Sequence, residues 1–156
     1  MRINVEGIVT GDVYMRREDL SVSAIFLEAI EIIFGIIYIG LQIYYGLYYH
    51  ITPYKFIMNL LAMILVYLGL SLLSCYPERI NNIAPEYCVG KIRKYSLRMI
   101  RLIKFVFVTG LLVPCVCDAI GYEILSVYSF IVIGVILVIA VYYESKIIKE
   151  IKNMSK

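Results

Sequence analysis

The sequence contains long runs without a charged residue, separated by short patches in which the charges gather. One of these runs, Ile32 to Tyr49, is just long enough to cross the hydrocarbon core of a bilayer, which is about 30 Å thick. Hydrophobic residues make up 62% of the 156-residue chain, against roughly 45–50% in ordinary soluble domains. A soluble fold of this size has too little interior to bury so much apolar surface. The sequence therefore predicts an integral membrane protein.

Four segments are apolar enough to be transmembrane helices, and short polar stretches connect them. We expect an all-α fold in which residues 1–156 form a single membrane bundle of four helices. The predicted spans are residues 22–49, 54–76, 97–122 and 124–143, and basic amphipathic segments are predicted at residues 91–104 and 144–156. The second of these segments is expected to leave the bilayer as a helix and then to lie along its surface.

The distribution of Lys and Arg predicts the orientation. With four spans, the two termini and the loop between the second and third spans lie on the same side. Fourteen of the fifteen Lys and Arg residues fall on that side, and Lys55 is the exception. Because cytoplasmic segments are enriched in Lys and Arg, we expect both termini to be cytoplasmic. The expected location is the plasma (cell) membrane.

A stripe of basic residues runs into the third span at intervals of three and four residues, which places its members along one side of a helix. The stripe consists of Lys91, Lys94, Arg98, Arg101 and Lys104. The favoured interpretation is contact between anionic lipid headgroups and Lys91, Lys94 and Arg98, because long basic side chains reach the headgroup region. The alternative is pairing of Arg98, Arg101 and Lys104 with acidic residues of the bundle.

The spacing Arg98-x-x-Arg101-x-x-Lys104 also resembles the every-third-residue arginine pattern of voltage-sensor helices. It departs from that family in two ways, because it lies on the third span rather than the last and at the cytoplasmic start of that span. The resemblance implies voltage sensing as a third interpretation of the basic stripe.

The first span carries a polar face that runs most of the way across the membrane. Its members follow steps of three and four residues: Glu28, Glu31, Gly35, Tyr38, Gln42 and Tyr45. A polar face in contact with lipid is costly, so we expect it to point into the bundle or at a partner. The first and third spans run in the same direction, which places the two glutamates at about the depth of the last three basic residues. We expect an ion pair there; the alternative is a carboxylate that binds a proton or a cation.

From the remaining residues we predict no catalytic residue, no cofactor site and no metal site. In Cys115-x-Cys117 the two thiols point to nearly opposite sides of a helix, so they cannot readily bridge. The one histidine, His50, has no Cys, Asp or Glu beside it. Nucleic-acid binding is not expected, because the basic residues alternate with apolar residues that must enter the bilayer.

Four spans with almost no soluble mass make a poor free-standing enzyme. We therefore expect a small, non-enzymatic, multi-pass membrane protein that acts as an accessory or interaction subunit through helix packing. Its expected partners are a bilayer with anionic headgroups and either a second copy of the chain or a larger membrane protein. The alternative function is a small oligomeric ion or proton channel or transporter that uses the polar face of the first span as its path.

Overall fold

The computed structural model describes residues 21–49, 52–80, 88 and 90–154, and within these ranges the chain is helical and contains no strand. The elements are α1 (Val22–Tyr48), α2 (Pro53–Cys75), the short 3-10 helix η3 (Pro77–Arg79), α3 (Gly90–Ile120) and α4 (Tyr128–Met154). All four α-helices are long and apolar enough to cross a membrane. The expected all-α membrane bundle of four helices is confirmed. His50 lies outside the described residues.

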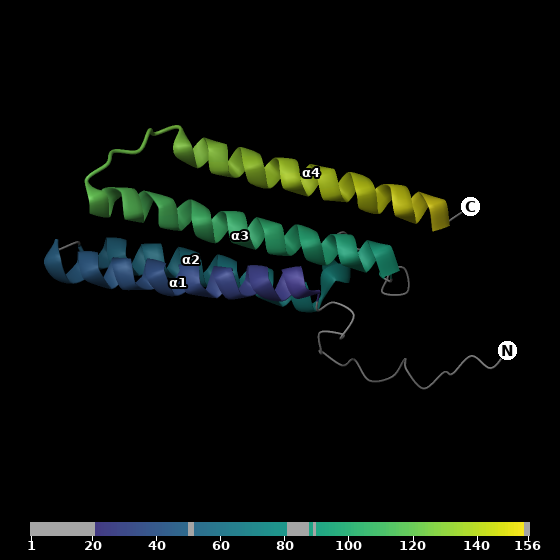
Figure 1. The fold of residues 1–156 in the computed structure, drawn as a ribbon, viewed down its shortest axis with the longest axis horizontal. Coiled ribbons are helices and arrows are strands. Elements are labelled where there is room, and N and C mark those ends of the chain that lie inside the picture. Colours follow the sequence, from purple (N-terminus) through teal and green to yellow (C-terminus); the bar gives the residue numbers. More distant parts are fainter. Residues whose placement is uncertain (1–20, 50–51, 81–87, 89, 155–156) are drawn as a thin grey trace.

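Helix α3 is the centre of the arrangement, with α4 on one side of it and the pair α1 and α2 on the other (Figure 1). It packs against all three of the other long helices. Accordingly, α3 has the largest set of buried residues, whereas α2 buries only Met63 and Ser74 and α4 only Ile147. Most of the surface of α2 and α4 is therefore apolar and uncovered, as expected where lipid is the solvent.

The helix ends follow from local chemistry. Ser21 is the N-cap of α1, and its hydroxyl accepts a hydrogen bond from the backbone N–H of Ala24 at 3.3 Å. Pro53 opens α2, where its missing N–H costs nothing. After α3 the chain turns at Gly121, whose φ of 77° is readily adopted only without a Cβ. The turn is longer than expected, so α4 begins at Tyr128 rather than near Ile124.

Two glycines allow the helices to approach closely. A Cβ added to Gly110 of α3 would lie 2.7 Å from a methyl group of Val132 on α4. A Cβ added to Gly35 of α1 would lie 3.0 Å from the terminal methyl group of Met63 on α2. Small residues at such contacts bring backbones together and increase dispersion contacts, which helps helices to associate in lipid.

We call the end of the bundle where α1 and α3 begin and α2 and α4 end the basic end (Figure 1). At the basic end α4 continues without a break to Met154 and packs on α3. Ile147 is fully buried there, and Lys91 of α3 lies 3.7 Å from Glu150 of α4. The segment is a straight extension of α4 in which Ile147 is covered by α3, whereas Ile148 is 63% exposed. That the segment lies along the bilayer stays a prediction.

Candidate functional site

The polar face of α1 is turned inward. Of its predicted members, Glu31, Gly35, Tyr38 and Gln42 are buried, and Ala24 is the only other buried residue of α1. The face therefore contacts α2 and α3. Polar side chains cost less free energy there than in contact with lipid. At its two ends it meets different partners, ionic ones toward the basic end and uncharged ones toward the opposite end.

Glu31 and Lys104 form the more deeply buried ion pair of the bundle. The Nζ atom of Lys104 lies 3.0 Å from Oε2 of Glu31, with the two side chains 5% and 0% exposed. The same ammonium group lies 4.9 Å from the centre of the Tyr67 ring on α2, within the range of a cation–π contact. Lys104 therefore connects α3 to both α1 and α2.

Glu28 and Arg101 form a second pair, next to the first and closer to the basic end. The Nε atom of Arg101 donates a hydrogen bond of 3.1 Å to Oε1 of Glu28. The arginine side chain is 6% exposed and the glutamate side chain 24% exposed, so this pair is partly open to its surroundings. Both glutamates of the predicted polar face thus lie against cations of the basic stripe.

Beyond the ion pairs, Gln42 is the centre of an uncharged network that joins three helices. Its Nε2 donates to Sγ of Cys115 on α3 at 3.2 Å, and its Oε1 accepts from Nδ2 of Asn59 on α2 at 3.4 Å. Tyr45 donates to the backbone carbonyl of Cys115 at 2.9 Å. The hydroxyl of Tyr38 donates to the backbone carbonyl of Asn59 at 3.5 Å, a long contact. Both the Nε2 donor and the Oε1 acceptor of the Gln42 amide therefore have hydrogen-bond partners.

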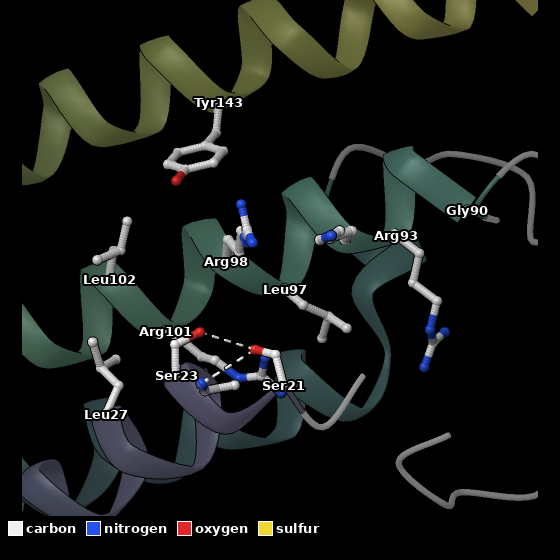
Figure 2. A pocket seen from close by; sticks show the side chains of 12 residues that line it. Ser21, Ser23, Leu27, Gly90, Arg93, Leu97, Arg98, Arg101, Leu102 and Tyr143 are labelled. Atoms are coloured by element: carbon white, nitrogen blue, oxygen red, sulfur yellow. Dashed lines mark hydrogen bonds between the residues drawn. The ribbon is translucent and has the colours of Figure 1, made fainter. Parts of the chain in front are cut away.

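The other predicted basic residues lie elsewhere. Arg98 is exposed and extends toward Tyr143 of α4 (Figure 2), and no carboxylate among the described residues pairs with it. Lys94 is exposed and lines the same cavity as Arg98, whereas Lys91 lies against Glu150 outside that cavity. Of the three candidate ion-pair partners, the structure brings Arg101 and Lys104 to the glutamates and not Arg98.

No protein-family profile, curated protein or solved structure matches this chain. The function of the site is therefore inferred from its own side chains. Within the described ranges, no three His, Cys, Asp or Glu side chains come together as metal ligands.

Three contributors to the site were not predicted as members of it: Asn59, Tyr67 and Cys115. Asn59 and Tyr67 do stand out as polar side chains in an otherwise apolar span, which is a usable signal. The register between α1 and α2 that places Asn59 beside Gln42 depends on packing of apolar side chains, so spacing along one helix does not give it. Cys115 carried no signal, because a lone thiol in an apolar helix is usually a small hydrophobic residue.

Proposed function

We propose that this chain is a non-enzymatic accessory subunit of a membrane assembly and acts through helix packing. One observation carries the proposal. The polar face of α1 is occupied by partners within the chain, namely Arg101 and Lys104 through ion pairs and Asn59 and Cys115 through hydrogen bonds. A pathway for ions would need such groups to face water.

The outer surfaces of α2 and α4 support the same proposal. They present large apolar side chains, among them Leu65 on α2 and Val138 on α4. Each surface also contains a glycine, Gly69 on α2 and Gly134 on α4, with no atom within 4 Å of an added Cβ. Small residues let the helix of another protein approach closely, so these surfaces are the ones on which a partner helix would pack.

A specific observation also favours the second candidate, a proton or cation transporter. Glu31 lines a cavity of about 230 Å³ between α1 and α2. Its Oε1 is buried and accepts no hydrogen bond from the described residues. An incompletely satisfied intramembrane carboxylate is a common binding site for protons and cations. The other residues around this cavity are mostly apolar, such as Ile36, Met63 and Leu68, which disfavours a continuous water path.

Flux and crosslinking together separate the two candidates. We expect vesicles containing the purified chain to show no more proton or cation flux than empty vesicles, and Glu31→Gln to leave that result unchanged. In the native membrane, a photoreactive amino acid at Leu65 or at Val138 should give an adduct of defined mass with another polypeptide.

The control for crosslinking is the same amino acid at Leu125, which is 81% exposed in the connection between α3 and α4. No adduct is expected from that position. Absence of adducts from both helix surfaces, together with a flux that Glu31→Gln abolishes in a stable protein, would replace the accessory subunit with the transporter.

A further inference from the structure

A cavity of about 510 Å³ opens at the basic end. It lies between the start of α1, the first half of α3 and Tyr143 of α4, as Figure 2 shows. Because α3 has 31 residues, it is roughly 46 Å long, which exceeds the hydrocarbon core of about 30 Å. Because the basic residues of α3 lie in its first half, we assign the excess length to the basic end. This assignment brings the first turns of α3, and with them this cavity, to the level of lipid headgroups.

Four cationic side chains line the cavity, Arg93, Lys94, Arg98 and Arg101, and no carboxylate of the described residues does. Arg101 is balanced by Glu28 at 3.1 Å. Lys94 and Arg98 have no ion-pair partner among the described residues. Like charges held close together repel one another unless an anion lies between them. The cavity is thus suited to a ligand with a negative charge.

Two helix N-termini add to this field. The N-cap of α1, Ser21, lines the cavity together with Ser23, and so does Gly90, the first residue of α3. The N-terminus of a helix carries a partial positive charge and unused backbone N–H groups, which favour phosphate. The Ser23 hydroxyl lies 3.1 Å from the hydroxyl of Ser21 and is a further polar group at the same place.

The remaining surface of the cavity is apolar. Its lining includes Ala24 and Leu27 of α1 and Leu97 and Leu102 of α3. Cationic residues combined with apolar ones match an amphiphile, whose phosphate contacts the basic residues and whose acyl chains cover the leucines. A small soluble anion would leave this apolar surface unused.

We propose that this cavity is a binding site for the phosphate headgroup of an anionic phospholipid. Lys94 and Arg98 bind the phosphate, and Leu27 and Leu102 contact the beginning of an acyl chain. Arg101 belongs both to this lining and to the ion pair with Glu28, whereas the phosphate contacts are assigned to Lys94 and Arg98, which take part in neither ion pair. The site differs from a general attraction between the basic end and an anionic leaflet. Lys91 is not a member of it, because that side chain lies against Glu150.

The test uses the full-length protein, purified in a neutral detergent, and measures lipid binding by native mass spectrometry. The probes are phosphatidylglycerol, phosphatidylcholine and inorganic phosphate. We expect phosphatidylglycerol to bind more tightly than phosphatidylcholine. Lys94→Gln and Arg98→Gln should each weaken phosphatidylglycerol binding about fivefold, since each removes one cation from the phosphate. Both side chains are exposed, so these variants should fold.

The matched control is Lys149→Gln, which removes the same charge from an exposed position of α4 outside the cavity. It should leave the affinity for phosphatidylglycerol unchanged. An equal loss in Lys149→Gln would overturn the proposal in favour of diffuse attraction. Equal binding of phosphatidylcholine would also overturn it. If inorganic phosphate alone displaces the lipid at equal concentration, the source of the phosphate is a free anion, and the assignment to a lipid is wrong.

Discussion

Lys104 and Glu31 hold opposite charges in the interior of the bundle, where the two whole residues are 4% and 0% exposed. A single Lys or Asp near the middle of a transmembrane helix costs about 2.5–3.5 kcal/mol on insertion scales. A buried pair has to overcome the desolvation of both charges, so its net contribution is small, whereas a charge left without its partner is costly. The pair therefore specifies which faces of α1 and α3 meet more than it adds to stability.

At the scale of single residues, the polar face of α1 and its depth could be predicted from spacing. The assignment of individual partners could not. Four of the buried residues of α3, Leu97, Arg101, Lys104 and Val108, follow steps of four, three and four, and this row carries the two cations that reach α1. Arg98 is one residue after Leu97 and is therefore rotated by about 100° around the helix. Its side chain extends toward α4 instead of α1 (Figure 2).

At Gly110 we expect the addition of a single methyl group to lower the stability of the protein. In Gly110→Ala the new methyl group would meet Val132 at 2.7 Å, and the branched valine side chain has little freedom to move within a helix. Overpacking of this kind costs about 1–3 kcal/mol, which outweighs the gain of roughly 0.5–1 kcal/mol from replacing a helical glycine. The apparent Tm of the purified protein should fall.

Two further variants test that explanation. Gly134→Ala, on α4, meets no atom within 4 Å, so its Tm should stay the same or rise. Adding Val132→Ala to Gly110→Ala should recover part of the loss, because it removes the methyl groups that clash. Equal Tm values for Gly110→Ala and Gly134→Ala would mean that α3 and α4 do not pack at this contact.

At the scale of helices, the sequence predicts that four transmembrane helices form. It predicts only in part which of them pack together. Long apolar runs define the four spans. Such runs form helices in lipid, because the helix pairs their backbone N–H and C=O groups with one another. Asn59 and Tyr67 indicate the inner side of α2, whereas α4 has no distinct polar face to indicate its neighbour. The position of α4 therefore depends on shape, as at Gly110. The helical continuation of α4 beyond the bilayer was expected, but the packing of Ile147 was not, because Ile147 reads as part of a membrane-facing stripe until α3 is known to cover it.

Aromatic and basic side chains reinforce that extension at the basic end. The rings of Tyr95 on α3 and Tyr143 on α4 lie 6.4 Å apart, and Lys146 lies 5.5 Å from the centre of the Tyr95 ring. Contacts of this type are individually modest. Together with buried Ile147 they hold this part of α4 against α3.

At the scale of the whole molecule, the structure places the described Lys and Arg residues other than Lys55 at or toward the basic end, where α1 and α3 begin (Figure 1). The side of the membrane to which this end belongs stays a prediction. The positive-inside rule predicts the cytoplasm.

Cysteine labelling in intact cells checks this orientation. In a background with the four native cysteines replaced by alanine, we expect a membrane-impermeant maleimide to label Tyr122→Cys, in the exposed turn after α3. It should label Asn153→Cys, in the last turn of α4, only after the cells are opened. Labelling of Asn153→Cys in intact cells would reverse the orientation.

The central claim is that the polar face of α1 joins α1 to α3 through buried ion pairs. A double-mutant cycle on Glu31 and Lys104, followed by thermal unfolding in detergent, tests it most directly. Glu31→Gln and Lys104→Gln should each destabilise the protein by about 3–5 kcal/mol, because each leaves a buried charge without its partner. The double variant should lose clearly less than the sum, with a coupling of about 1–3 kcal/mol. Additive losses, or a Glu31→Gln variant more stable than the parent protein, would contradict the claim.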